Sequence, residues 1–302
     1  MTFEAGLPSI ADSAHNFYSQ HGEDGILAEL FRRLDLNSGY FVEFGAWDGM
    51  RYSNTYMLAQ SGWSGCYIEG DPARYDTLRR NVPQESIRKV IRFVQPSGPD
   101  SLDSILQEVG APRVPEVLSI DIDSDDLAVW RGLKTFRPLC VVIEYNPTIP
   151  YDTRFENVSG KNWGNGPRSI TEHAAGTGYR LVAVTRTNLI FLDSHSSRDN
   201  EAAVRTICLA DVEPSLRYFF GMDGSLLHIT EPDVTVARAP EFYRVPWTKA
   251  IAAQPVPRRL RRYVDNDESF MRRRRTVMAA AAGLSRPIAM VRALTASRRS
   301  GS

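Results

Sequence analysis

The sequence lacks the features that mark membrane-spanning and disulfide-stabilised proteins. No uninterrupted apolar run reaches the roughly 18 residues that a membrane-spanning helix needs, so we expect no transmembrane segment. The N-terminus has no basic stretch followed by an apolar core, and we expect a mature chain that starts near Met1. The three cysteines, Cys66, Cys140 and Cys208, are scattered, and two of them lie in apolar runs. This pattern favours small core residues over a disulfide or metal role and favours a cytoplasmic protein.

Net charge is absent as well, because 36 Lys and Arg residues balance 36 Asp and Glu residues. The charges are unevenly distributed, since residues 257–302 carry twelve arginines and only three acids. We interpret this arginine-rich tail as a solvated extension with a helix near 276–283. The alternative is a surface that contacts anionic lipid, nucleic acid or an acidic partner.

The sequence does contain two short apolar runs that each end near an acid and a glycine. The first is Phe41-Val-Glu-Phe-Gly-Ala-Trp-Asp-Gly49, and the second is Cys66-Tyr-Ile-Glu-Gly-Asp71. Their apolar residues fit parallel strands buried on both faces, and the glycines of the first run let the backbone turn tightly beside a ligand. Glu69, about 20 residues beyond that turn, could accept hydrogen bonds from the two hydroxyls of a ribose. Together the runs predict a bound nucleoside cofactor.

The turn itself narrows the choice of cofactor. A dinucleotide site uses G-x-G-x-x-G facing a pyrophosphate, whereas this chain has Glu43-x-Gly45-x-x-x-Gly49 with Trp47 and Asp48 inside the loop. Bulk and negative charge would block a diphosphate but suit a cofactor with a cationic centre. The loop and the acid at the second strand end resemble the S-adenosylmethionine site of class I methyltransferases. That resemblance implies S-adenosyl-L-methionine as the cofactor, with Glu43 and Asp48 near its amino acid end.

The residues that we expect to bind this cofactor lie at the expected strand ends and in the loops that follow them. Gln95, just after the third expected strand, could face the edge of the adenine. The full candidate set is Glu43, Gly45, Ala46, Asp48, Gly49, Glu69, Gly70, Gln95 and Asp121.

Other segments resemble the FkbM-type methyltransferase family over roughly residues 15–193. They are Tyr18-Ser-Gln-His-Gly-Glu-Asp-Gly-Ile26, Leu118-Ser-Ile-Asp-Ile-Asp123, Val141-Val-Ile-Glu-Tyr-Asn146, Gly178-Tyr-Arg-Leu-Val-Ala-Val184 and Asn188-Leu-Ile-Phe-Leu192. The resemblance implies O-methylation of a hydroxyl on a sugar or natural product, hence a small-molecule or glycan acceptor. It also implies that the segment with Gln20 and Asp24 lies across the cofactor mouth. The chain departs from the family pattern after the fourth expected strand, where it has Asp121-Ile-Asp123 in place of Asp-x-Glu-Gly.

Alternating helix and strand patterns predict an α/β fold with a seven-stranded, doubly wound, mostly parallel sheet that ends in an antiparallel hairpin. The expected strands are 40–44, 65–68, 90–94, 117–122, 140–144, 179–185 and 189–192. The expected helices are 24–34, 53–61, 72–81, 101–109, 125–133 and 169–176, the last with a capping box at Ser169 and Glu172. We expect an N-terminal segment over 1–38, a methyltransferase domain over 39–193, edge elements or a lid over 194–256, and the tail over 257–302.

The candidate catalytic residues are the acids at the ends of the fourth and fifth expected strands, Asp121, Asp123 and Glu144. The two aspartates would share one face if their strand continued. One acid could act as general base on an acceptor hydroxyl, or the two aspartates, with Glu144 or Asn146, could hold Mg²⁺. We favour the metal-free base or simple positioning of the acceptor.

Two other classes of protein stay open at this point. Asp121-x-Asp123 matches the D-x-D of a metal-dependent nucleotide-sugar glycosyltransferase, although this leaves the loop after Glu43 unexplained. The chain could also be a non-catalytic adapter with a methyltransferase fold whose arginine-rich tail does the binding.

Overall fold

A computed structural model describes residues 8–212, apart from 148, 150, 200 and 201, and the backbone of four strands between residues 217 and 245. The chain divides into two compact units. The described residues of the first unit lie in 8–146 and 154–212, and all predicted site residues belong to it.

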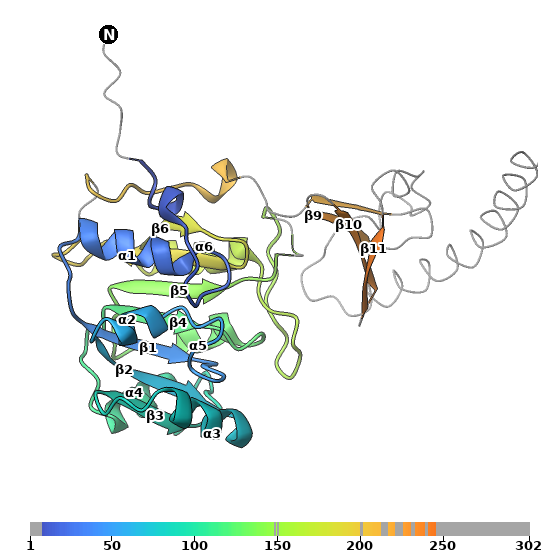
Figure 1. Cartoon of the computed structure of the whole chain (residues 1–302). Helices are drawn as coiled ribbons and strands as arrows, with labels where there is room; N and C mark the ends of the chain where they lie inside the picture. Colours follow the sequence, from blue (N-terminus) through green and yellow to red (C-terminus); the bar gives the residue numbers. More distant parts are fainter. Residues whose placement is uncertain are drawn as a thin grey trace, which may run out of the picture. The chain divides into compact units, whose positions relative to one another are not determined.

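The first unit alternates strands and helices along the chain (Figure 1). Its strands are β1 (Tyr40–Phe44), β2 (Ser64–Glu69), β3 (Ile87–Ile91), β4 (Val117–Ile120), β5 (Cys140–Glu144), β6 (Tyr179–Val184) and β7 (Asn188–Asp193). Its helices are α1 (Glu23–Arg33), α2 (Tyr56–Gln60), α3 (Pro72–Asn81), α4 (Leu102–Glu108), α5 (Asp126–Gly132) and α6 (Pro167–Gly176). Two 3-10 turns, η1 (Ile10–Ser13) and η2 (Leu209–Asp211), stand near the ends of this unit.

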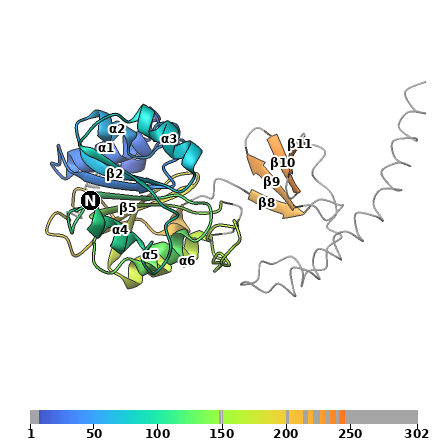
Figure 2. The same cartoon turned by 90° about the horizontal axis from the view of Figure 1, so that it is seen from below.

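The seven strands form one sheet in the order β3-β2-β1-β4-β5-β7-β6. β1 to β5 pair with one another in parallel, whereas β7 is antiparallel to both β5 and β6. Helices α1 to α3 cover one face of the sheet and α4 to α6 cover the other (Figure 2). The predicted seven-stranded, doubly wound, mostly parallel α/β fold is thus confirmed. The strand order reverses between β1 and β4, which is where such sheets bind ligands.

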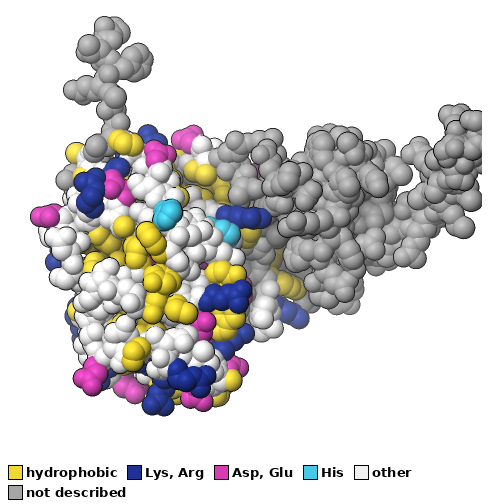
Figure 3. Space-filling model, in the orientation of Figure 1, with side chains coloured by type: hydrophobic (Ala, Val, Ile, Leu, Met, Phe, Trp, Pro, Cys, Tyr) yellow, Lys and Arg dark blue, Asp and Glu magenta, His cyan; other side chains and the backbone are white. Residues whose placement is uncertain are grey.

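The core follows from this double cover. Strands buried on both faces need continuous apolar runs, and Phe41, Val42 and Phe44 of β1 are fully buried. Cys66 and Cys140 are buried free thiols in β2 and β5, as expected for small core residues. On the face that Figure 3 shows, side chains of both charges are interspersed over the first unit, so this face has no extended field of one sign.

Most element boundaries differ from the expected ones by one to three residues, and α2 begins three residues later than expected, at Tyr56. β3 begins and ends three residues earlier than expected, and β4 stops at Ile120. α6 begins at Pro167, with Gly166 as its N-cap, because proline suits the first helical position. The capping box predicted at Ser169 is wrong, since the Ser169 hydroxyl accepts a hydrogen bond from the Phe155 amide at 3.0 Å.

The second unit contains a four-stranded antiparallel sheet in the order β11-β10-β9-β8. Its strands are β8 (Arg217–Phe220), β9 (Leu226–Thr230), β10 (Asp233–Arg238) and β11 (Glu241–Val245). These strands fall in the region expected to supply edge elements or a lid, and they pair with one another. The arginine-rich tail lies outside the described residues. Within the described part of the chain, no helix has the length and apolarity that crossing a bilayer requires.

Candidate functional site

A cavity of about 660 Å³ lies at the carboxyl ends of β1, β2, β4 and β5, within the size range of small-molecule sites. Two of the predicted residues, Asp48 and Gly49, do not line it. The predicted residues that do line it are Glu43, Gly45, Ala46, Glu69, Gly70, Gln95, Asp121, Asp123 and Glu144.

Gly45 lets β1 and β4 approach each other at the floor of the cavity. Its φ is +74°, a conformation that side chains rarely adopt, and a Cβ atom there would lie 1.6 Å from the Asp121 carbonyl oxygen. Because that neighbour is backbone, a side chain at this position would have to displace the strand end or the turn after it. The predicted role of Gly45 in a tight turn beside a ligand therefore has a local steric basis.

Glu43 lines the cavity, but its carboxylate is taken up by hydrogen bonds from the chain. It accepts from the Ser53 hydroxyl at 2.7 Å, the Thr55 hydroxyl at 2.5 Å, and the Asn54 and Thr55 amides, both at 3.2 Å. Burial raises the pKa of Glu43, and these donors act in the opposite direction. Glu43 therefore anchors the segment that leads into α2, and its predicted place near the amino acid end of a cofactor stays a prediction.

Glu69 joins the two loops at the ends of β1 and β2. Its carboxylate accepts from the Trp47 amide at 2.7 Å and from the Asp71 amide at 2.8 Å, one bond to each oxygen. Each oxygen keeps acceptor capacity toward the cavity, which a ribose diol requires. Asp71 itself caps α3 by accepting from the Ala73 and Arg74 amides, both at 2.9 Å, as its position before Pro72 suggests.

Asp48 and Gly49 shape the loop from outside the cavity. The Asp48 carboxylate accepts from the Met50 amide at 3.0 Å and from the Arg51 amide at 2.7 Å. Gly49 is buried with φ +76°, and a Cβ atom there would lie 2.2 Å from Leu78 of α3. Both residues thus hold the loop in shape, and the structure does not bring them to the cavity lining.

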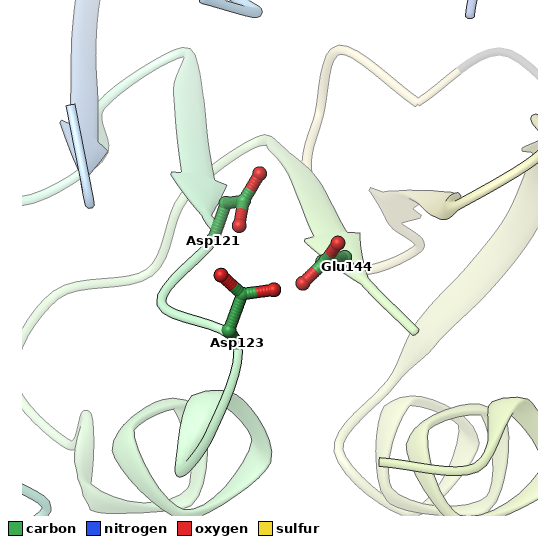
Figure 4. Close-up of side chains that lie close together, drawn as sticks. All are labelled: Asp121, Asp123 and Glu144. Atoms are coloured by element: carbon green, nitrogen blue, oxygen red, sulfur yellow. The ribbon is translucent and has the colours of Figure 1, made fainter. Parts of the chain in front are cut away.

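Asp121, Asp123 and Glu144 form a group that we call the acidic trio, at the ends of β4 and β5 (Figure 4). One oxygen of each carboxylate lies within 4.8 Å of an oxygen of the others. Because β4 stops at Ile120, the two aspartates do not share a strand face as expected. A turn with φ +58° at Asp123 brings them together instead.

Asp126 holds that turn in place. Its buried carboxylate accepts from the Ile122 and Ser124 amides, each at 2.8 Å. Burial raises the pKa of Asp126 to about 6, and these amide bonds act against the rise. Asp126 lies in the first turn of α5, where the helix dipole favours an acid, and it also holds the turn before that helix.

The electrostatics of the acidic trio favour binding of a proton or a cation. Burial raises the pKa of Asp121 and of Glu144, and repulsion between the neighbouring carboxylates raises both further. Two such carboxyl groups cannot both ionise without cost, so the trio retains a proton near neutral pH. A retained proton, a positively charged ligand group or a divalent cation would each relieve this repulsion.

Sequence reasoning missed a set of side chains around the cavity that we call the arginine-aromatic rim. It comprises Trp47, Arg51, Tyr52, Arg74, Arg92 and Phe93. The three aromatic side chains are 36%, 43% and 69% exposed for Trp47, Tyr52 and Phe93 respectively. Trp47 and Tyr52 also have positive φ, which non-glycine residues adopt mainly in strained or functional loops. The only sequence signal was the place of Trp47 inside the motif loop, because the other members of the rim lie outside that loop.

The N-terminal segment reaches the cavity through Gln20. Asp24 does not line the cavity and is fully buried. Its carboxylate accepts hydrogen bonds from the amides of Phe17, Tyr18 and Ser19 at 2.7–2.8 Å. Asp24 therefore folds the segment that carries Gln20. Of the two residues that the family resemblance placed at the cofactor mouth, the structure brings only Gln20 to it.

No protein-family model matches the chain, and no curated protein is similar to it in sequence. Similar solved structures include a TehB-like SAM-dependent methyltransferase from Corynebacterium glutamicum, at 11% identity and a TM-score of 0.36, over 61% of this chain and 92% of that one. The O-methyltransferase TomG from Streptomyces achromogenes, in complex with SAM, is 15% identical with a TM-score of 0.41, over 64% and 92%. An O-methyltransferase from Bacillus cereus, in complex with SAH, is 16% identical with a TM-score of 0.40, over 63% and 92%.

Likeness at these identities concerns the fold alone. The α/β class of this chain rests on its own strand order and on the double cover of its sheet. The FkbM-type resemblance is carried by the motifs and stays a prediction.

Proposed function

We propose that the protein is an S-adenosylmethionine-dependent methyltransferase. One observation carries this proposal. Gly45, Glu69 and the acidic trio line the same cavity, and this cavity lies where the strand order of the doubly wound sheet reverses. The motif resemblance implies the same cofactor, which has no diphosphate and so suits the loop that contains Trp47 and Asp48.

The donor groups of the cavity fit the parts of this cofactor. Glu69 offers carboxylate oxygens to the ribose hydroxyls, and Gln95 offers a polar group to the adenine. The acidic trio offers negative charge to the cationic sulfonium and ammonium groups. When bound, S-adenosylmethionine supplies a methyl group that is activated because it is attached to a positively charged sulfur.

The residues of the acidic trio supply the acid-base chemistry in this proposal. One of the carboxylates would accept the proton of an acceptor hydroxyl, while bound S-adenosylmethionine would supply the methyl group and keep the electron pair of the broken carbon–sulfur bond. A base works best when its pKa lies near the working pH, and burial and repulsion move the pKa of Asp121 and Glu144 upward in that direction.

The acceptor that we propose is a hydroxyl of a sugar or natural product, on the strength of the FkbM-type resemblance. Gln20 and the acidic trio line the cavity together, which supports a contact of Gln20 with the amino acid end of the cofactor or with the acceptor. Assay of candidate acceptors for cofactor turnover, with and without Mg²⁺, tests both the acceptor class and the need for a metal.

The geometry of the acidic trio also supports a second candidate, a bound divalent cation. Three carboxylate oxygens within 4.8 Å of one another match the oxygen ligands that Mg²⁺ prefers. Such an ion would lower the pKa of the acceptor hydroxyl and replace the general base. The glycosyltransferase alternative uses the same carboxylates, and binding of a nucleotide sugar with Mn²⁺ but not of S-adenosylmethionine would favour it.

Calorimetric titration with S-adenosylmethionine tests the proposed function directly. We expect micromolar binding by the wild-type protein and its loss in Glu69→Ala and Gly45→Val. Asp71→Ala is the matched control, because Asp71 lies in the same turn but caps α3 outside the cavity. Absence of binding at millimolar cofactor would contradict the proposal. The adapter alternative loses its support if removal of residues 257–302 leaves affinity and turnover intact.

A further inference from the structure

We propose that Arg51 binds the carboxylate at the amino acid end of the cofactor. This inference rests on the proposed function and assigns a cation to the carboxylate of the cofactor, which the predicted residues do not supply. All the charged residues predicted to bind the cofactor are acids, yet its amino acid end carries a carboxylate beside an ammonium group. A carboxylate in a cavity lined by acids needs a cation or several hydrogen-bond donors.

The cavity lining contains three arginines, and they differ in what they already bind. Arg92 forms ion pairs with Asp100 at 3.2 Å and with Glu108 at 3.3 Å. Among the described residues, neither Arg51 nor Arg74 forms an ion pair. Two arginines of the lining therefore keep their charge available for an anionic ligand group.

Arg51 is held in place by contacts other than an ion pair. Its guanidinium lies 5.4 Å from the Trp47 ring centroid and 4.7 Å from that of Tyr52, and it donates to the Tyr52 hydroxyl at 3.0 Å. Its backbone amide donates to Asp48 at 2.7 Å. The two rings belong to the residues with φ of +48° and +62°, so the loop maintains an uncommon backbone on both sides of Arg51. Such ordering lowers the entropy lost when the guanidinium binds a ligand.

The chain position of the two arginines separates their roles. Arg74 lies in the first turn of α3, next to the Asp71 cap, and so belongs with Glu69 and the ribose end. Arg51 precedes Ser53 to Thr55, the segment that binds Glu43 of β1, and Asn54 in that segment donates to Ser119 of β4 at 3.0 Å. Arg51 is therefore tied to the β1 and β4 side, where the acidic trio would attract the sulfonium and ammonium groups.

Two ligands that differ only at the amino acid end test this assignment. S-adenosylhomocysteine carries the amino acid, whereas 5′-methylthioadenosine has the same nucleoside and thioether without it. We expect Arg51→Ala to weaken binding of S-adenosylhomocysteine by about 10- to 100-fold, the usual effect of losing a charge-assisted hydrogen bond. Binding of 5′-methylthioadenosine should stay unchanged, and Arg51→Lys should retain part of the affinity because it keeps the charge.

Arg74→Ala is the matched control, because the Arg74 guanidinium lies 5.7 Å from the centroid of the same Trp47 ring and the substitution removes the same charge. We expect it to leave the ratio of the two dissociation constants unchanged. An unchanged ratio in Arg51→Ala, or a ratio that changes only in Arg74→Ala, would overturn the inference while leaving the proposed function in place. Failure of the wild-type protein to bind either ligand would overturn both. Arg51 is exposed, so melting temperatures should show that the variant folds normally.

Discussion

Two groups of carboxylates border the same cavity, and they differ in what surrounds them. At the ends of β1 and β2, Glu43 and Glu69 accept hydrogen bonds from backbone amides and hydroxyls of the adjoining loops. At the ends of β4 and β5, Asp121, Asp123 and Glu144 have one another as neighbours. The carboxylates of the first group stabilise the loops around the cavity through hydrogen bonds. Those of the second group repel one another, and a proton or a cation would relieve this repulsion.

This difference shows that the position of an acid at a strand end does not determine its role. A buried carboxylate is stable when donors surround it, and it is costly when other carboxylates do. The acidic trio is therefore the part of the cavity lining where burial and mutual repulsion of carboxylates reduce stability. Isosteric replacement of Glu by Gln in each group should separate the two cases.

The largest effect is expected for Glu43→Gln. The amide group of glutamine would face a backbone or hydroxyl donor that now binds a carboxylate oxygen, so at least one buried group would lose its partner. We expect the free energy of unfolding to fall by about 1–3 kcal/mol, measured by urea denaturation. Glu108→Gln, at an exposed side chain paired with Arg92, is the control and should change stability by less than about 0.5 kcal/mol. Equal stability of Glu43→Gln and wild type would mean that Glu43 is already protonated.

A second prediction concerns Asp126, an acid that lies beside the acidic trio but is bound by amides as in the first group. Asp126→Ala removes a negative charge from the repelling cluster, yet it leaves the Ile122 and Ser124 amides without their acceptor. We expect the lost hydrogen bonds to outweigh the relief of repulsion and to lower stability by about 1–2 kcal/mol. Thermal denaturation would measure this. A gain in stability would mean that repulsion, rather than the loss of donors, governs this turn.

A sequence can reveal the strands but not the partners of their end residues. The extents of β1, β5 and α3 matched the expected ones, because each is an apolar run or amphipathic segment bounded by local signals such as Asp71 before Pro72. β4 was expected to continue to Ile122, since its apolar residues alternate that far. It stops at Ile120 because Asp126 binds the amide of Ile122 and turns the chain, a contact that strand patterning cannot show.

The same limit applies to the site. The order of the sheet brings Glu43, Glu69 and Glu144 to one cavity, and this follows from the doubly wound pattern. The hydrogen-bond donors around Glu43 come from a segment ten to twelve residues further along the chain. The sequence therefore could not show that these donors occupy the Glu43 carboxylate. Arg51 stayed unnoticed because its orientation depends on positive φ at the two aromatic residues, which local propensity does not predict.

A third prediction has the opposite sign from the first. Glu144→Gln removes a carboxyl group whose pKa is raised by burial and by repulsion from Asp121, Asp123 and Asp126. We expect the free energy of unfolding at neutral pH, without ligand, to rise by about 1 kcal/mol, since each pKa unit of such a shift corresponds to about 1.4 kcal/mol. The melting temperature should then increase by about 2–4 °C. A lower melting temperature would show that the acidic trio is stabilised by a contact other than those among its members.

The smallest effect is the pH dependence of that gain. A carboxyl group whose pKa is raised in the folded state binds more protons there than in the unfolded state, so the free energy of unfolding falls as pH rises above the unfolded value near 4.5. Wild-type protein should therefore lose stability relative to Glu144→Gln between about pH 5 and pH 8, by less than about 1.4 kcal/mol for each pH unit. Urea denaturation at several pH values in the presence of EDTA would measure the difference. A difference that stays constant or shrinks over this range would mean that Glu144 is already ionised at pH 5, and the contrast between the two groups of carboxylates would then rest on geometry alone.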